Sequence, residues 1–205
     1  MPATMMHLYA GCRLFPSRNE SFLLGCILPD CVDADRALKD RLHFRDVEPT
    51  ERLPHLVGFG KLLDLARPFD LGVLFHFYLD YLWDNGPQSA HRRSYSGDNW
   101  FRDYRKELRR AGNITAQRFE ENDALWQRLA EAVKDPALRE SVFLLPEEDV
   151  QSFMAFNVHF HTEERLPESA VFSAAVVEEF TDRAVRAFRL FLNQFFPELR
   201  GGTVL

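Results

Sequence analysis

Leu-Gly-Val-Leu-Phe-His-Phe-Tyr-Leu-Asp-Tyr-Leu-Trp, residues 71–83, carries the strongest structural signal in this chain. The segment is almost continuously apolar, and Asp70 stands before it as a good N-cap. The pattern therefore predicts a helix that runs to about Asp84. His76 and Asp80 are four residues apart, so a helix places both side chains on one face, about one turn from each other.

Helical periodicity continues on both sides of this segment, and convincing strands of alternating polarity are hard to find. The helices predicted before it span residues 4–14, 21–28, 33–44 and 50–66, the last one kinked near Pro54. After it, the polar residues 85–97 are predicted as the longest loop. Further helices are predicted from a cap at Asp98 to a stop before Gly112, and over 115–133, 147–162 and 169–196. The sequence thus predicts an all-α fold, a single-domain helical bundle over residues 1–205.

Bulk composition fits a globular protein and argues against several functional classes. The chain has 205 residues, 46% of them hydrophobic, and its 19 Phe indicate a bulky core with few polar atoms. A net charge of −6 argues against a dedicated nucleic-acid binder and against anchoring to anionic lipid. The sequence shows no secretion signal, no stretch as long as a membrane span and no disulfide pattern among its three Cys. We therefore predict a cytoplasmic protein without integral membrane contact.

The pair His76 and Asp80 has two interpretations. Both residues interrupt an apolar stripe, and a buried carboxylate is costly unless it is paired or binds a metal. The two side chains are therefore either a hydrogen-bonded pair or two metal ligands. Taken alone, the spacing favours neither.

Three further residues occur in similarly apolar surroundings. His7 follows Met-Met, Asp30 follows Leu-Gly-Cys-Ile-Leu-Pro, and His43 stands between Leu and Phe. Each has an ordinary alternative: a core histidine, a turn or cap aspartate, and a histidine bonded to Asp46 or to a carbonyl. Together with His76 and Asp80, they are more readily explained as ligands of a divalent metal. Imidazole and carboxylate groups suit zinc, iron, manganese or nickel.

The order of these residues resembles that of a known family. His7, Pro29-Asp30, His43-Phe44-Arg45-Asp46, and Leu71-Gly72 leading to His76 and Asp80 resemble the zinc-dependent phospholipase C family, in particular a short, non-secreted bacterial branch. The resemblance covers roughly the first 85 residues. It implies a helical bundle with a cleft for several zinc ions. Asp30, His43, His76 and Asp80 would surround one ion, and His7 with a bridging Asp80 would help to hold a second.

The chain also departs from this family. The secreted enzymes use the amino group of a processed N-terminal Trp as a ligand, whereas this chain begins Met-Pro. They also have a His shortly after the His-x-x-x-Asp helix, and here the next one is His91, in the predicted loop. Their further His, followed one turn later by Glu, is matched in spacing by His159 and Glu163 at a helix end. We treat His91, His159 and Glu163 as possible additional ligands, with solvent-exposed or structural residues as the alternative.

Other residues are candidates for roles around the metal. Asp30 or Asp80 is predicted to act as a base as well as a ligand. Arg45, Arg92 and Arg93 are candidates for neutralising a substrate phosphate, with solvated surface as the alternative. Because ligating histidines usually donate their second N–H to an oxygen, Asp46, Tyr78 and Asp84 are candidate acceptors.

Three functional hypotheses follow. The first is a metal-dependent hydrolase that uses activated water on a phosphate ester, with a small soluble ester expected at least as much as a phospholipid. The second is a non-catalytic helical binding module with a structural metal or none. The third is an HD-type phosphohydrolase. It ranks lower because the His-Asp dipeptide typical of that superfamily does not occur here.

Overall fold

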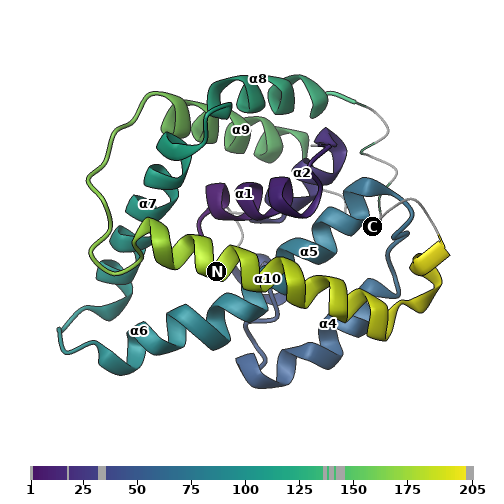
Figure 1. Ribbon diagram of the computed structural model, residues 1–205, viewed down its shortest axis with the longest axis horizontal. Helices are drawn as coiled ribbons and strands as arrows, with labels where there is room; N and C mark the ends of the chain where they lie inside the picture. Colours follow the sequence, from purple (N-terminus) through teal and green to yellow (C-terminus); the bar gives the residue numbers. More distant parts are fainter. Residues whose placement is uncertain are drawn as a thin grey trace.

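A computed structural model describes residues 2–17, 19–31, 36–135, 138, 141 and 146–201. Every regular element in these residues is a helix (Figure 1), so the prediction of an all-α fold is confirmed. The elements are α1 Thr4–Leu14, α2 Glu20–Ile27, η1 Leu28–Cys31, α3 Arg36–Leu42, η2 Pro49–Glu51, α4 Arg52–Gly60, α5 Pro68–Trp83, η3 Asp84–Gln88, α6 Ser89–Ser94, α7 Trp100–Arg118, α8 Asn122–Ala132, α9 Glu147–Thr162, α10 Ala174–Phe195 and η5 Pro197–Gly201.

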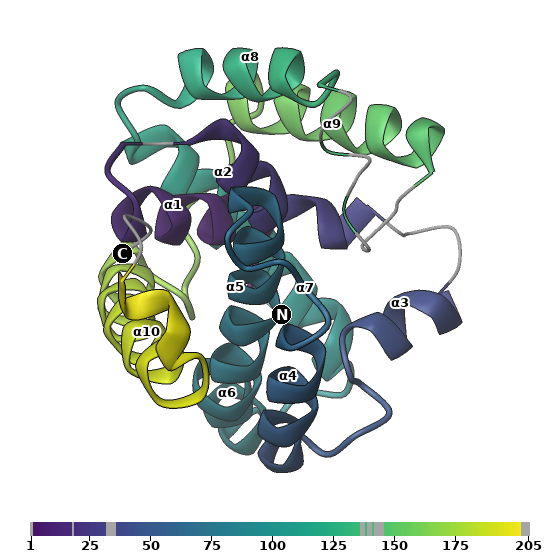
Figure 2. The same ribbon diagram turned by 90° about the vertical axis from the view of Figure 1, so that its right-hand side faces the viewer.

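Helix α5 lies at the centre of the bundle. Every residue from Phe69 to Asp80 is buried, as expected for a helix that is apolar on all sides. Helices α1, α2, α4 and α10 pack around it, and Figure 2 shows α5 between α10 and α4. The metal candidates His76 and Asp80 therefore lie inside a closed shell of helices.

The closest helix crossing joins α2 to α5, and glycines make it possible. A Cβ atom added at Gly25 would overlap the carbonyl oxygen of Phe69, and one added at Gly72 would overlap the carbonyl oxygen of Phe22. The two backbones thus touch without intervening side chains. Because η1 follows α2 directly, this crossing also fixes where Asp30 lies relative to α5.

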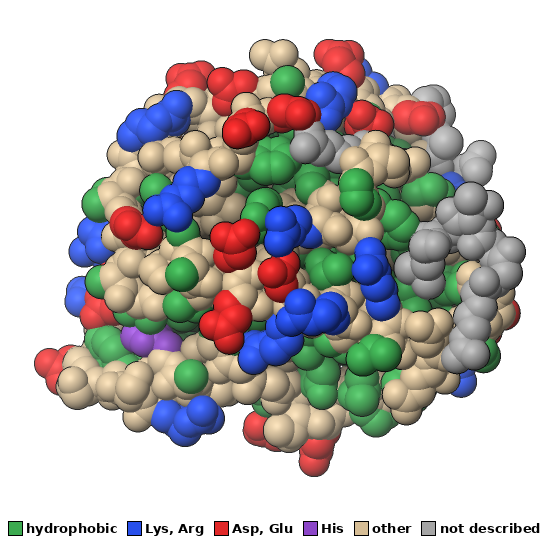
Figure 3. All heavy atoms as spheres, in the orientation of Figure 1, with side chains coloured by type: hydrophobic (Ala, Val, Ile, Leu, Met, Phe, Trp, Pro, Cys, Tyr) green, Lys and Arg blue, Asp and Glu red, His purple; other side chains and the backbone are tan. Residues whose placement is uncertain are grey.

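Helix α10 covers one side of α5 and is strongly amphipathic. Its buried face includes Phe180, Phe188 and Leu192, while charged residues occupy the outer face. One outer residue, Asp182, accepts a 2.6 Å hydrogen bond from Arg13 of α1. On the face drawn in Figure 3, acidic and basic side chains are interspersed over this region.

The prediction of a loop over residues 85–97 is wrong for most of this segment. A π-helical turn, η3, continues α5 directly into α6, and the helical backbone ends only at Ser94. Pro87 lies inside this turn and lacks an N–H group, while neighbouring side chains add hydrogen bonds to the backbone. Asn85 Nδ2 donates to the carbonyl oxygens of Tyr81 and Pro49, both at 2.9 Å, and Ser89 Oγ donates to Asp84 O at 2.6 Å. The bond to Pro49 comes from a distant segment, so local composition could not predict it.

Other predicted boundaries were wrong by a few residues or more. Helix α7 runs through Gly112 instead of stopping before it, because this glycine allows close approach to Ala3 rather than ending a helix. The helix predicted over 115–133 is two helices, with a break after Arg118. Helix α5 begins at Pro68, so Asp70 lies in its first turn and is not its cap. Helix α10 begins only after Ser173, whose hydroxyl accepts from Val176 N.

The remaining predictions fared better. Helices α1 and α9 match residues 4–14 and 147–162. Part of the predicted helix 33–44, namely residues 33–35, lies outside the described residues. The three cysteines are buried. Among the described helices, none is both long and apolar enough to cross a membrane.

Candidate metal centre

Five predicted ligands converge beside α5. His7 comes from α1, Asp30 from η1, His43 from the turn after α3, and His76 and Asp80 from α5. Their exposed fractions are 0%, 5%, 2%, 0% and 2%, in that order. Segments far apart in sequence thus bring five imidazole and carboxylate groups to one buried place.

Local structure directs each side chain inwards. Pro29 lies in η1, the short 3-10 turn that follows α2 and carries Asp30. After His43 the chain reverses through Phe44, whose φ of 52° is uncommon for a residue other than glycine. This reversal leaves the His43 ring packed against Phe77, with ring centroids 5.2 Å apart.

Two of the histidines are held in a defined tautomer. His43 Nδ1 lies 2.8 Å from Lys39 O, and His76 Nδ1 lies 2.8 Å from Cys26 O. A carbonyl oxygen can only accept a hydrogen bond, so both Nδ1 atoms carry the proton and donate. Burial, reinforced by the neighbouring His7, lowers the pKa of His76 to about 3, so its ring is neutral at neutral pH. The Nε2 of His76 therefore presents a lone pair, and the Nε2 of His43 presents one in the neutral form of its ring.

The two Nε2 atoms face each other. They are only 3.2 Å apart, and between two neutral rings this contact is unfavourable unless a cation, either a proton or a metal ion, lies there. In a tetrahedral zinc site with bonds of about 2.0–2.1 Å, neighbouring ligand atoms lie roughly 3.3 Å apart. His43 Nε2 is also 3.5 Å from Asp30 Oδ1, which fits the same geometry.

The carboxylates accept few hydrogen bonds for buried charged groups, although basic side chains lie within 4 Å of them. Both oxygens of Asp80, Oδ1 of Asp30 and both ring nitrogens of His7 have no hydrogen-bond partner within the described part of the chain. Burial alone would raise the pKa of Asp80, but the nearby His76 and His7 outweigh it and hold that pKa below its ordinary value. Buried carboxylates with so few hydrogen bonds are uncommon in a protein interior, and a bound metal ion would supply the missing interactions.

The donor atoms form two overlapping groups. One consists of His7, His76 and Asp80, and the other of Asp30, His43 and His76. Because His76 has a single free lone pair, it can bind only one ion at a time. Asp80 has two oxygens: Oδ1 lies 3.3 Å from His7 Nε2, and Oδ2 lies 3.7 Å from His43 Nε2. This buried set can therefore hold a metal ion.

Lys39 is a residue near the centre that the sequence analysis missed. Its ammonium group donates to Asp30 O at 3.0 Å and lies 3.4 Å from Asp30 Oδ1. Burial opposes ionisation of Asp30, but contact with His43 and the charge of Lys39 hold the pKa of this carboxyl well below its usual range. Lys39 stands four residues before His43, so helical spacing is the signal that could have identified it.

The candidate acceptors for the histidine N–H groups lie elsewhere, which corrects that prediction. Main-chain carbonyls accept these hydrogens, as described above. Asp46 is exposed, and Tyr78 packs against Phe188 and Phe191 of α10, where burial raises its pKa to about 12. Asp84 accepts a 2.6 Å hydrogen bond from Arg52 in a buried ion pair.

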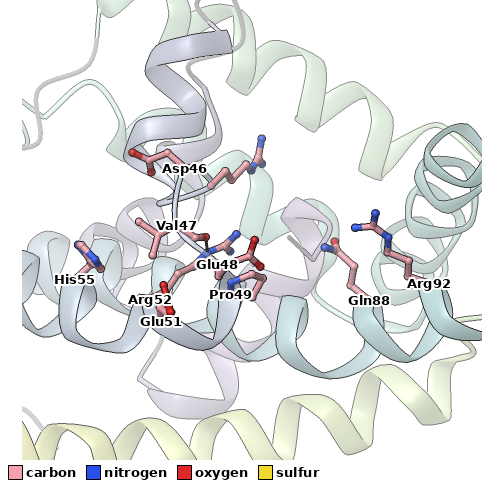
Figure 4. A pocket seen from close by; sticks show the side chains of 10 residues that line it. Asp46, Val47, Glu48, Pro49, Glu51, Arg52, His55, Gln88 and Arg92 are labelled. Atoms are coloured by element: carbon pink, nitrogen blue, oxygen red, sulfur yellow. Dashed lines mark hydrogen bonds between the residues drawn. The ribbon is translucent and has the colours of Figure 1, made fainter.

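Two of the three candidate phosphate-binding arginines share one pocket. Arg45 and Arg92 both line a pocket of about 560 Å³, together with Arg52 and the turn 46–49 (Figure 4). Arg93 is exposed and does not line it, because neighbouring residues on a helix leave in different directions. Sequence reasoning also missed Arg52, whose buried pairing with Asp84 depends on packing between α4 and the α5–η3 junction.

The possible additional ligands do not join the two donor groups. His91 lies in α6, with its ring packed against Trp100, Tyr104 and Phe172. His159 and Glu163 form the expected pair, with 3.1 Å between Nδ1 and Oε2, but their side chains are 60% and 69% exposed. The two side chains therefore lie on one face of the helix end, as their spacing predicts, but that face is turned to solvent.

His159→Ala is accordingly expected to leave the bound metal unchanged. The ion pair is exposed, so its loss should also change the free energy of unfolding by less than about 0.5 kcal/mol. Metal analysis and urea unfolding of this variant beside the wild type check both points. A drop in the number of bound ions would show that α9 contributes a ligand.

Comparisons of this chain with protein-family models, with curated proteins and with solved structures found no match.

Proposed function

We propose that this protein is a metal-dependent hydrolase that acts on phosphate esters, with zinc as the ion. The observation that carries the proposal is the buried convergence of His43 Nε2 and His76 Nε2, 3.2 Å apart, with carboxylate oxygens of Asp30 and Asp80 that accept no hydrogen bond within the described residues. Iron, manganese and nickel accept the same ligands. The ligand order shared with the zinc-dependent phospholipase C family is the second support.

Each side chain has a role in this proposal. Asp30, His43, His76 and Asp80 would hold one ion, and His7 with the other oxygen of Asp80 would contribute to a second. A bound divalent ion supplies an electrophile for phosphoryl oxygens and lowers the pKa of water. Asp30 or Asp80 would accept the proton of the attacking water, since each has an oxygen without a hydrogen-bond partner. The surrounding apolar shell excludes other water and strengthens these interactions.

Phosphate esters are the proposed substrates because a cationic group, the ammonium of Lys39, lies 3.4 Å from Asp30 Oδ1. Arg45 lines the pocket, where its guanidinium group donates to Asp40 at 2.7 Å. Guanidinium and ammonium groups match the charge of a phosphate.

One observation favours a second candidate, a helical binding module with a structural metal. All five ligands are at most 5% exposed, and structural zinc sites are closed whereas catalytic ones keep an open position. This candidate predicts that metal removal lowers stability but that the loaded protein never turns over a substrate.

Metal analysis followed by an activity screen tests the proposal. The purified protein is expected to contain zinc, and a chelator should lower its melting temperature reversibly. The zinc-loaded protein should then hydrolyse members of a panel of phosphomonoesters, phosphodiesters and phospholipids. Absence of any bound ion and of any stabilisation by added zinc, iron, manganese or nickel would overturn both candidates. Stable zinc binding without turnover would favour the second.

A further inference from the structure

The candidate metal centre is closed in this structure, although an ion must be able to enter it. All five candidate ligands are at most 5% exposed. Protein interiors are closely packed, so an ion cannot pass between the side chains unless some of them move. A metal site therefore needs an entry path, and one of the segments that carry the ligands must open to provide it.

The segments that carry the ligands differ in how deeply they are packed. Most residues of α1 and α5 are buried, and so are all residues of η1. None of the α3 residues whose side chains are described is buried, namely Ala37, Lys39, Asp40, Arg41 and Leu42. Figure 2 shows α3 at the edge of the bundle. A segment opens most easily where it buries least apolar surface, so α3 is the ligand-carrying segment that can move at the lowest cost.

Aromatic packing anchors the chain just beyond α3. The ring of Phe44 contacts those of Phe59 and Phe77, with centroids 6.0 Å and 5.8 Å apart. The backbone of Phe44 also reverses direction, with a φ of 52°. Hinges are commonly residues at the end of an element that absorb a change in backbone angles. Phe44 is therefore the natural pivot for a movement of α3, and His43 lies on the moving side.

Lys39 connects α3 to the body of the protein at the metal centre. Its ammonium group donates to Asp30 O at 3.0 Å and lies 3.4 Å from Asp30 Oδ1, and its side chain is only 13% exposed. Its main-chain oxygen accepts a 2.8 Å hydrogen bond from His43 Nδ1. Lys39 thus contacts a ligand on each side of the boundary between α3 and η1. Charge-assisted hydrogen bonds are stronger than neutral ones, so this contact can hold α3 in place.

We propose that α3 is a lid over the metal centre, latched by the contact between Lys39 and Asp30, and that it opens about Phe44 to admit the ion. A bound ion would join His43 on the lid to Asp30 and His76 on the body of the protein, and so keep the lid closed. Lys39 is a positioning residue here and does not bind the metal. The inference rests on the proposed function only in that an ion binds at this centre.

Two cationic residues of α3 provide matched variants for the test. Lys39→Met removes the latching ammonium but keeps an unbranched side chain, whereas Arg41→Met removes an exposed charge from the same helix. Chelator-treated protein is mixed rapidly with cobalt(II), whose visible absorption changes when imidazole and carboxylate ligands bind it. If the lid opens before the ion binds, the observed rate reaches a plateau at high cobalt concentration, and this plateau equals the opening rate.

Lys39→Met is expected to raise this plateau about tenfold, because a hydrogen bond between charged groups is lost. Arg41→Met should leave the plateau within about twofold of the wild type, as expected for an exposed charge. Attraction between the ion and the protein changes the initial slope of the rate but not the plateau. Loss of a positive charge alone therefore cannot produce the expected result. A rate that rises linearly without a plateau, or an equal plateau in the two variants, would overturn the inference.

Hydrogen exchange of the α3 amides keeps the test separate from the proposed function. In the chelator-treated protein, Lys39→Met should speed this exchange about tenfold, with α5 unchanged and Arg41→Met like the wild type. Added zinc should slow the exchange of α3 in the wild type. Absence of ester hydrolysis would reject the proposed function and leave these expectations intact. Equal exchange of α3 in the two variants would reject the latch, whether or not the loaded protein hydrolyses an ester.

Discussion

His76→Ala is expected to lower the zinc affinity of this protein by at least about 100-fold, the upper range seen when even an indirect partner of a ligand is lost. His76 is the residue shared by both donor groups, so a single ion in either group would lose a ligand. Its ring is also fixed on two sides, by the 2.8 Å hydrogen bond to Cys26 O and by stacking on His7 with centroids 4.1 Å apart. Zinc titration of the chelator-treated variant against a competing indicator measures the change.

A buried histidine outside the donor groups serves as the matched control. His161 is 3% exposed, and its ring stacks on Trp126 with an interplanar angle of 8°. His161→Ala removes a ring of equal size and leaves a comparable cavity, so it should destabilise the fold without weakening zinc binding. Equal losses of affinity in the two variants would mean that packing, and not ligation, accounts for the effect of His76→Ala.

The sequence predicted the central part of this centre for a simple physical reason. A run of apolar residues with two polar ones four apart specifies a buried helix and the relative position of both side chains, as found for His76 and Asp80. The positions of His7, Asp30 and His43 do not follow from periodicity, because three separate chain segments deliver them. Their grouping was expected from their apolar surroundings and, above all, from the order of the motifs along the chain.

The failures of the sequence prediction have a common cause, namely partners that lie far away in the chain. Residues 85–94 have the composition of a loop, yet the bond from Asn85 to Pro49 O helps to hold them helical. Gly112 is of a residue type that often ends a helix, yet here it lies inside α7 and allows this helix to approach Ala3 closely. His159 and Glu163 illustrate another limit of sequence prediction. Their spacing correctly predicts that they share a helix face, but spacing alone does not say whether that face is buried or turned to solvent.

Gly25→Ala and Gly72→Ala are each expected to lower the free energy of unfolding by about 3 kcal/mol, near the upper end for overpacking. At both positions an added Cβ would overlap a backbone carbonyl of the facing helix, and backbone cannot move aside as a flexible side chain can. Urea unfolding followed by circular dichroism measures the change.

Gly58→Ala is the control for the intrinsic effect of glycine in a helix. Gly58 lies in α4, is exposed, and an added Cβ would meet nothing within 4 Å. This variant should therefore gain about 0.5–1 kcal/mol from the better helix propensity of alanine. A similar gain for Gly25→Ala would show that α2 and α5 are not in backbone contact.

The same crossing links stability to the metal centre. Asp30 is attached to α2 through η1, whereas His76 and Asp80 belong to α5, so pushing the two helices apart separates the ligands. Ligand atoms must lie within a few tenths of an ångström of their ideal positions to bind zinc tightly. Any Gly25→Ala protein that still folds should therefore bind zinc more weakly than Gly58→Ala, measured at a temperature where both are folded. Equal zinc affinity in the two variants would show that the α2–α5 crossing does not position Asp30 as a ligand. Zinc binding would then depend on His7, His43, His76 and Asp80 alone.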